Sequence, residues 1–443
     1  MEVTLIGMGP GGAESLTAAA AEALERADCL IGSRRLLETC ALAPGAPRLP
    51  ATRSPEILER LTGQAWAAPC VLYSGDTGFH SGAQALLPLL RDRGIAARVL
   101  PGISSLQYFA ARLGRSWQDW RPVSAHGLSC DPVGEVLSAR GSPVFFLTGG
   151  AGGAGELCAQ LTQAGLGHLT ATLGESLSYP EERVRSGPVR ELAGQASAPL
   201  SVLLVEGYEP PANAPRSQGL DDAVFLRGDV PMTKQEVRAA VLAKLEVRDG
   251  AVYWDVGAGT GSVSVELALL APRSRVYAVE CRGEACALIR ANRERFAAYN
   301  LTLAQGRAPQ ALEALPAPDG VFIGGSDGEL LPILQAALEK NPAARVCLTA
   351  IAVETLGAAA AALAQLGMEP RITQLTVARS KPAGGLNLML GQNPVWIVTG
   401  QREALVGSWS TGPPWTLRGR ACASSRRSWR PGASSSPRTG RRW

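Results

Sequence analysis

VYWDVGAGTGSVSVELALL, residues 252–270, carries the clearest fold signal in this chain of 443 residues. An apolar, β-rich run ends at Asp255, a glycine-rich turn follows, and an apolar helical pattern begins near Ser262. A strand, a glycine turn and a helix in this order are typical of the first unit of a doubly wound α/β sheet. The glycines permit a tight turn and let the backbone approach a ligand closely. The free N–H groups at the start of the helix favour an anionic group there.

The spacing of these glycines separates two kinds of ligand. Dinucleotide binding asks for a glycine at position 262, where this chain has serine. The G-x-G-x-G pattern suits S-adenosylmethionine instead, because its anionic group is one carboxylate rather than a pyrophosphate. The loop residues are Gly257, Ala258, Gly259, Thr260 and Gly261. The next strand pattern ends at Glu280, whose carboxylate we expect to accept hydrogen bonds from ribose hydroxyls. The alternative is a purely structural turn with a surface glutamate.

Three flanking motifs refine this prediction. GRAP, residues 306–309, follows the third strand pattern, where an adenine edge would lie. Upstream, Thr233 and Glu236 form the T-x-x-E of a capping box, which predicts a helix start and by itself accounts for Thr233. VFIGGSDGEL, residues 321–330, replaces the Asn/Asp-Pro-Pro-aromatic signature usual in methylases of exocyclic base nitrogens. Its paired glycines leave open space, which is compatible with a bulky flat substrate.

Six motifs of the second half together resemble one family. They are MTKQEVRA, DVGAGTGSVSVELALL, VYAVE, GRAP, VFIGG and NPVW, within about residues 221–400. They resemble the decarboxylating, C15-methylating methyltransferases of cobalamin biosynthesis. The resemblance implies a class I, Rossmann-like methyltransferase fold. It also implies cofactor contacts at Thr233, the 257–261 loop, Glu280 and Ala308.

The first half opens with a second glycine turn, LIGMGPGGAESLT, residues 5–17. Three of its glycines fit the dinucleotide fingerprint G-x-G-x-x-G. A nicotinamide site requires an acidic residue after the second strand pattern, but this chain has Arg34 and Arg35 at that point. An NADP-dependent redox enzyme, with both arginines on the 2′-phosphate, therefore stays open on spacing alone.

Two further small-residue turns weaken that alternative. YSGDTGFHSGA, residues 73–83, and LPGISSLQ, residues 100–107, each follow a strand pattern. Three such turns at strand ends suggest one cleft around a compact ligand, whereas a dinucleotide site normally relies on the first loop. Structural alternatives remain: Asp76 as a turn brace, and Ser104 and Ser105 as a helix N-cap.

These turns resemble the tetrapyrrole methylases, also called class III methyltransferases, over about residues 1–208. SAHGL, residues 124–128, resembles the C5-methylating subgroup, which often has arginine where Leu128 stands. The family fold has two α/β subdomains with S-adenosylmethionine folded between them. The resemblance implies cofactor contacts at Gly9, Asp76, Phe79, Ser104 and Ser105.

Both resemblances point to one pathway. Together they imply S-adenosylmethionine-dependent methylation of a precorrin macrocycle at C5 and C15, with decarboxylation of the C12 acetate side chain. They also imply one cofactor site in each half and a homo-oligomer. No general base is identified, because the donor is already activated and in-line placement supplies much of the rate.

Strand and helix patterns alternate in both halves, which predicts mostly parallel sheets with crossover helices. EPPANAPRSQGLDD, residues 209–222, lacks periodicity and is typical of a linker. We therefore expect a tetrapyrrole methylase domain at 1–208, a linker at 209–220, a methyltransferase domain at 221–403 and a disordered basic tail at 404–443.

The tail distorts the overall charge. Residues 408–443 hold eight arginines and neither an acid nor a lysine, so the net charge of +4 becomes −4 for residues 1–407. The tail is either a basic arm for nucleic acid or membrane, or a disordered or out-of-frame end, and the second is favoured. The mildly acidic body predicts no nucleic-acid partner.

The remaining features of the composition argue against a metal-binding, membrane or secreted protein. The nine cysteines form no C-x-x-C and only three histidines exist, which predicts reduced, buried thiols and no metal site. No apolar run reaches the roughly 20 residues that span a bilayer. The chain starts with a strand pattern rather than a basic then apolar segment, so we expect no membrane association and a cytoplasmic location.

Overall fold

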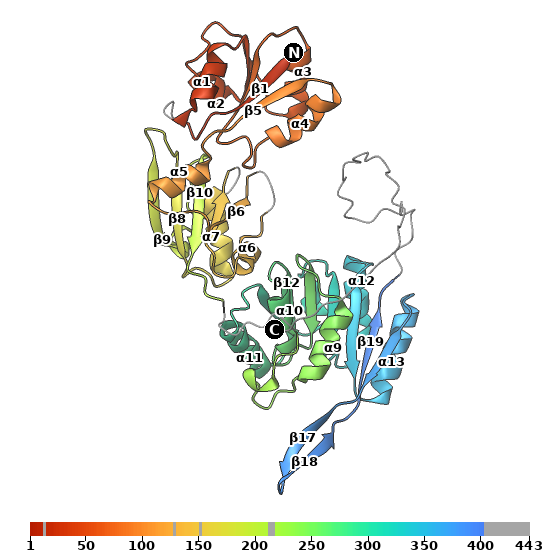
Figure 1. The fold of residues 1–443 in the computed structure, drawn as a ribbon. Helices are drawn as coiled ribbons and strands as arrows, with labels where there is room; N and C mark the ends of the chain where they lie inside the picture. Colours follow the sequence, from red (N-terminus) through yellow and green to blue (C-terminus); the bar gives the residue numbers. More distant parts are fainter. Residues whose placement is uncertain (12–14, 127–129, 150–152, 211–217, 403–443) are drawn as a thin grey trace, which may run out of the picture. The chain divides into compact units, whose positions relative to one another are not determined.

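The structure is a computed structural model (Figure 1). It describes residues 1–11, 15–126, 130–149, 153–210 and 218–402. The predicted basic tail and Leu128 lie outside the described residues. So does Gly12, the third glycine of the dinucleotide fingerprint.

The first sheet is fully parallel, as the alternating pattern predicted, with strand order β3-β2-β4-β1-β5. Its strands are β1 (Glu2–Gly7), β2 (Cys29–Gly32), β3 (Arg48–Pro50), β4 (Pro69–Tyr73) and β5 (Ala96–Leu100). Its helices are α1 (Ala18–Glu25), α2 (Arg34–Thr39), α3 (Ser54–Thr62) and α4 (Ala83–Asp92). Apolar residues of β1 supply both faces: Val3 and Leu5 pack in one core cluster and Ile6 in another. The glycine-rich turns therefore emerge at one edge, where parallel strands end.

The second sheet differs from the prediction. Its order is β6-β7-β10-β8-β9, and only β6 and β7 are parallel. Its strands are β6 (Arg121–Ser124), β7 (Val144–Leu147), β8 (Thr170–Glu175), β9 (Arg183–Pro188) and β10 (Ser201–Glu206), with helices α5 (Ser105–Arg112), α6 (Pro132–Ser138), α7 (Gly153–Gln163) and α8 (Val189–Leu192). The expectation of a mostly parallel sheet is wrong here, because β8 and β9 are joined by a short loop that needs no crossover helix. Strand β9, RVRSGP, is largely exposed and carries no apolar pattern.

The third sheet has the order β13-β12-β11-β14-β15-β19-β16, and its first five strands are parallel (Figure 1). The strands are β11 (Val252–Val256), β12 (Arg275–Glu280), β13 (Leu301–Gln305), β14 (Gly320–Ile323), β15 (Arg345–Ala350), β16 (Arg371–Leu375) and β19 (Val395–Gly400). The helices are α9 (Gln235–Leu245), α10 (Ser262–Leu270), α11 (Gly283–Arg295), α12 (Leu330–Lys340) and α13 (Val353–Gln365), with 3₁₀ turns η2 (Asp222–Val224) and η3 (Gln310–Leu312). Strand order reverses at β11, so the carboxyl ends of β11 and β14 form the crevice where such sheets bind ligands.

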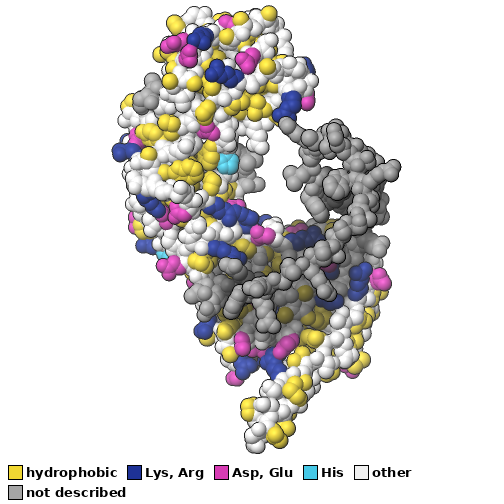
Figure 2. Space-filling model, viewed as in Figure 1, with side chains coloured by type: hydrophobic (Ala, Val, Ile, Leu, Met, Phe, Trp, Pro, Cys, Tyr) yellow, Lys and Arg dark blue, Asp and Glu magenta, His cyan; other side chains and the backbone are white. Residues whose placement is uncertain are grey.

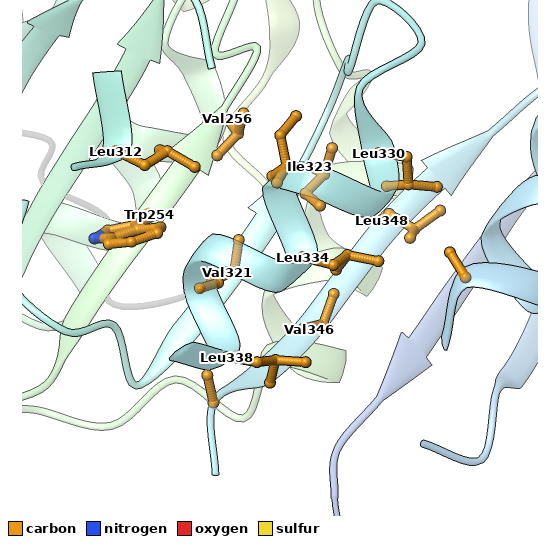
Figure 3. Close-up of a cluster of buried hydrophobic side chains, with 14 of the residues drawn as sticks. Trp254, Val256, Leu312, Val321, Ile323, Leu330, Leu334, Leu338, Val346 and Leu348 are labelled. Atoms are coloured by element: carbon orange, nitrogen blue, oxygen red, sulfur yellow. The ribbon is translucent and has the colours of Figure 1, made fainter. Parts of the chain in front are cut away.

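Alternating side chains of this sheet fill two cores. Trp254 and Val256 of β11 point into one cluster with Leu334 of α12 (Figure 3). Tyr253 of the same strand and Phe322 of β14 belong to the cluster on the opposite face. Because both faces are covered, these strands are nearly all apolar and were recognisable in the sequence.

The predicted linker is in part built into the second half. The backbone N–H groups of Gly219 and Leu220 donate to the Glu266 carboxylate, at 2.6 and 2.9 Å. The same carboxylate pairs with Arg238, whose side chain is fully buried and also contacts Asp222. The second half of the chain is thus anchored from residue 219 onward.

A two-stranded hairpin extends from the third sheet. Strands β17 (Ala378–Ala383) and β18 (Leu386–Gly391) pair with each other alone, and the sequence reading did not predict them. Figure 2 shows hydrophobic side chains along this hairpin. The large exposed ones are Leu386, Leu388, Met389 and Leu390.

Candidate functional site

The three small-residue turns of the first half meet, as the predicted single cleft requires. A Cβ added to Gly102 would lie 2.4 Å from the Gly75 carbonyl oxygen and 2.5 Å from that of Gly7. Gly9 and Gly75 exchange two backbone hydrogen bonds of 3.1 and 2.8 Å. Only glycine permits this backbone-to-backbone packing.

Asp76 braces this arrangement. Its Oδ2 accepts a hydrogen bond from the Gly78 N–H at 2.6 Å, and its Oδ1 accepts one from the Gly102 N–H at 3.1 Å. The turn-bracing alternative for Asp76 is therefore present in the structure. The residue also lines a cavity, so bracing and ligand contact are compatible.

The cavity, of about 430 Å³, lies between the first and second sheets. This size is typical of a small-molecule site. Of the predicted cofactor residues of this half, Asp76, Phe79 and Ser105 line it. Ser104 is buried and caps α5, with its Oγ accepting from the Gln107 N–H at 3.1 Å, so the N-cap alternative holds for Ser104. Gly9 is not a lining residue, whereas the adjacent Pro10 is.

The second sheet supplies a wall that the quoted motifs indicated only at His126, within SAHGL. Tyr179, in the loop between β8 and β9, lines the cavity together with His126 and Thr148. Its ring packs on the first glycine turn, since a Cβ on Gly11 would lie 2.3 Å from the Tyr179 Cζ. Arg35 donates to the Tyr179 hydroxyl. This wall depends on tertiary pairing, which local sequence does not encode.

The two arginines considered for NADP differ in position. Arg35 lines the cavity and also donates from Nη2 to the Ser74 hydroxyl at 3.1 Å. Arg34 is exposed and is not a lining residue. A phosphate held by both side chains in this cavity is therefore not supported by the geometry.

In the second half the glycine loop is fixed by conformation and by packing. Gly257, Gly259 and Gly261 have φ values of 70°, 58° and 76°, in the left-handed region that favours glycine. A Cβ on Gly257 would lie 2.5 Å from the carbonyl oxygen of Gly325. The missing side chain at Gly257 thus lets the turn after β14 approach the loop, and a Cβ on Gly325 itself would meet open space. This backbone cradle has the shape that a closely approached ligand needs.

Glu280 is a buried residue, which excludes the surface-glutamate alternative. Its Oε2 accepts from the Gly259 N–H at 2.9 Å, and its Oε1 accepts from Cys281 and Arg282 N–H at 2.9 Å each. A carboxylate has about four acceptor positions. After three are used, capacity for one further hydrogen bond remains, which fits a ribose hydroxyl.

The other loop residues lie near the same crevice edge. Ala258 packs against the core on one face of the sheet and Ala308 against the core on the other. Thr260 is fully buried, and its hydroxyl has no hydrogen-bond partner among the described residues.

The predicted capping box is wrong. Helix α9 begins at Gln235, and its N-cap is Lys234, without a side-chain cap bond. The Glu236 carboxylate instead pairs with Arg379 of β17, which lowers the pKa of Glu236. An ion pair with a distant strand therefore outweighs the local bond that the T-x-x-E pattern predicted. Thr233 contributes its carbonyl oxygen to Arg238.

Asp255, at the end of β11, is a candidate that the motif analysis did not single out. Its side chain is buried and accepts a hydrogen bond from the Ser264 hydroxyl of α10. Its Oδ1 has no partner among the described residues. Burial raises the pKa of this carboxyl to about 7. An unpaired buried oxygen beside a glycine loop is the signal that marks it.

The described cysteines are free thiols, and six of the eight are buried. Burial raises the pKa of Cys70, Cys158 and Cys347 to about 12. Within the described ranges no cluster of potential metal ligands is found. Nor does any helix there have the length and apolar character needed to cross a membrane.

Comparison with known proteins matches each half of the chain to a protein family. Residues 2–193 match the tetrapyrrole (corrin/porphyrin) methylases, and residues 224–400 match the precorrin methyltransferase domain. Both are methyltransferase domains, so the chain carries two of them, and the predicted fold class is confirmed.

Individual relatives specify the family. The precorrin-6Y C(5,15)-methyltransferase [decarboxylating] of Sinorhizobium sp is 32% identical over 401 residues, covering 90% of this chain and 95% of the relative. The probable cobalt-precorrin-6B C(15)-methyltransferase (decarboxylating) of Pyrobaculum calidifontis is 44% identical over 41% of this chain and 94% of its own. A crystal structure of precorrin-6Y C5,15-methyltransferase from Geobacter metallireducens has 38% identity and a TM-score of 0.42, covering 44% of this chain and 100% of that one.

This chain belongs to the family of decarboxylating precorrin-6Y C(5,15)-methyltransferases. The predicted enzyme class, an S-adenosylmethionine-dependent methyltransferase, is confirmed with it.

Proposed function

We propose that the first half, residues 1–208, methylates C5 of a precorrin macrocycle and that the second half, residues 221–403, methylates C15 and removes carbon dioxide from the C12 acetate. Residues 209–220 connect the halves, with Gly219 and Leu220 hydrogen-bonded to Glu266 of the second half, and 404–443 are the tail. The coverage of one Sinorhizobium relative over 95% of its length carries the proposal, because both halves of that decarboxylating C(5,15)-methyltransferase have counterparts here.

One S-adenosylmethionine binds in each half. In the first half the cavity residues Asp76, Phe79 and Ser105 contact it, together with Gly9 in the turn after β1 and Ser104 at the N-cap of α5. When bound, the cofactor supplies a methyl group already activated on a sulfonium. The protein's own work is to hold the acceptor carbon in line and to exclude water, which can supply roughly 7–11 kcal/mol in well-oriented systems.

In the second half the class I, Rossmann-like crevice holds the cofactor. The contacts come from the 257–261 loop, Glu280, Thr233 and Ala308. The cradle formed where Gly257 meets Gly325 supports this placement. The remaining acceptor position of Glu280 serves a ribose hydroxyl.

Calorimetric titration of the full chain tests the two-site proposal. We expect two S-adenosylhomocysteine molecules per chain and no binding of NADPH. A stoichiometry of one would contradict a site in each half. Binding of NADPH would restore the redox alternative. Incubation with precorrin-6Y and S-adenosylmethionine, followed by NMR of the product, identifies which ring positions receive methyl groups.

We further propose a cytoplasmic homo-oligomer without nucleic-acid or membrane partners. The hairpin supports self-association, because a two-stranded sheet with open edges and exposed Leu388 and Leu390 is marginal alone in water. Light scattering should show a smaller assembly for Leu388→Ser/Leu390→Ser. Val184→Ser, at an exposed position on β9, should leave the mass unchanged.

A further inference from the structure

Arg35 is a cation in the wall of the first-half cavity without a carboxylate partner among the described residues. Its two hydrogen bonds go to neutral hydroxyls, those of Tyr179 and Ser74. Asp76 lines the same cavity, but its printed hydrogen bonds go to two backbone N–H groups, and among the described residues no ion pair joins it to Arg35. A half-buried guanidinium that lacks a counter-charge is disfavoured unless an anion completes its environment.

The structure holds this guanidinium in place from both sheets. Arg35 lies on α2 of the first subdomain, and Tyr179 reaches it from the loop that follows β8. Its planar fork has five donors, and the two hydroxyls account for one on each terminal nitrogen. Donors therefore remain for a planar, bidentate acceptor.

The loop that carries Tyr179 is itself constrained. Ser176 and Ser178 have φ values of 47° and 68°, which non-glycine residues rarely adopt. Glu182 closes the loop by accepting from the Ser178 N–H at 2.7 Å and from the Tyr108 hydroxyl at 3.0 Å. Strained residues that persist in this way cluster at ligand sites. The strain here serves to place the tyrosine hydroxyl on Arg35.

We propose that Arg35, oriented by Tyr179 and Ser74, binds a carboxylate of a ligand in this cavity. The inference deepens the proposed function, since it assumes that the cavity holds the methyl donor and the macrocycle. A carboxylate matches the guanidinium fork and forms two parallel charge-assisted hydrogen bonds. Two ligands offer this group: the amino-acid end of the donor and an acetate side chain of the macrocycle.

The test compares Arg35→Ala with Arg34→Ala in the full chain. Arg34 is the adjacent residue of the same helix, exposed and outside the cavity wall, so it controls for charge loss. Arg35→Ala should raise the KM of one ligand in C5 methylation by about 10- to 100-fold. C15 methylation by the same chain should stay within twofold, which shows that the second half remains folded. Arg35→Lys should recover part of the loss.

Binding measurements distinguish the two sources of the carboxylate. If the donor supplies it, Arg35→Ala weakens S-adenosylhomocysteine at one of the two sites but spares 5′-methylthioadenosine, which lacks the carboxylate. If the macrocycle supplies it, S-adenosylhomocysteine binding is unchanged and the KM for precorrin-6Y rises.

Two results would overturn the inference. In one, Arg35→Ala behaves like Arg34→Ala toward both ligands. In the other, it weakens S-adenosylhomocysteine and 5′-methylthioadenosine equally, which indicates a structural role. Failure of the proposed function is a different result: the unaltered chain would then form no C5-methylated product.

Discussion

The two candidate sites use the same device in different settings. In each, a carboxylate accepts backbone N–H bonds and fixes a glycine turn: Asp76 in the first half and Glu280 in the second. The second-half site is assembled at the edge of one sheet. The first-half cavity has walls from two sheets, and a hydrogen bond from Arg35 to the Tyr179 hydroxyl joins these walls.

This difference shows why one site was easier to predict. Loop, acid and third-strand turn of the second half follow one another at strand ends, so their order in the sequence is their order in space. The far wall of the first-half cavity comes from the loop between β8 and β9, which belong to a different sheet from the strands that carry the glycine turns. No local pattern marks Tyr179 for that reason.

The largest expected effect comes from a substitution that should inactivate the second-half site and leave the first-half site active. Gly257→Val adds a side chain at φ 70°, and its Cβ lies 2.5 Å from the Gly325 oxygen. We expect loss of C15 methylation and decarboxylation by more than about 100-fold, with C5 methylation retained. NMR of the product measures both positions. Gly283→Ala, where a Cβ meets nothing within 4 Å, is the control.

The reciprocal variant acts on the first half. Gly102→Val places a Cβ 2.4 Å from the Gly75 oxygen and separates the three turns. C5 methylation should fall by about 100-fold while C15 methylation continues. Gly45→Ala, which meets open space, should have no effect. Loss of both methylations in Gly102→Val would show that the halves do not work independently.

A smaller effect is expected from the acid of the second half. Glu280→Gln removes the charge that strengthens three backbone hydrogen bonds, and it turns one acceptor oxygen into a donor. The KM for S-adenosylmethionine in C15 methylation should rise about tenfold, and that of C5 methylation should not change. Steady-state kinetics with separate quantification of the two methyl positions decides this. An equal rise for both positions would argue against Glu280 as a cofactor contact of one half.

The last expected effect is on stability rather than on activity, and it is a pH dependence from Asp255. Its carboxyl keeps a proton to about pH 7 in the folded chain but has an ordinary pKa of 3.8. The folded state therefore binds more protons between these values, and stability falls as pH rises through that window. Asp255→Asn lacks this titrating group, so its stability relative to the unaltered chain should improve by about 3 kcal/mol from pH 5 to pH 8. Urea unfolding at both pH values measures it, and a pH-independent difference would contradict the raised pKa.

Much of the fold was predictable from the sequence. The structure confirms the strands predicted around the glycine turns, and β4 and β11 were recognisable because buried parallel strands are continuous apolar runs. Strands β9 and β17 escaped prediction because they are mostly exposed and their sequences, RVRSGP and ARSKPA, lack alternation. The capping box at Thr233 failed because Glu236 has a stronger partner, Arg379, 143 residues away.

The burial of the thiols has a consequence for methylation of the protein by its own methyl donor. A methyl sulfonium is an alkylating agent, and a thiolate is the most reactive nucleophile a protein offers it. With the pKa of Cys70, Cys158 and Cys347 raised to about 12, these sulfurs stay protonated at neutral pH. The same apolar packing that stabilises the two halves thus keeps these three thiols from competing with the macrocycle for the methyl group.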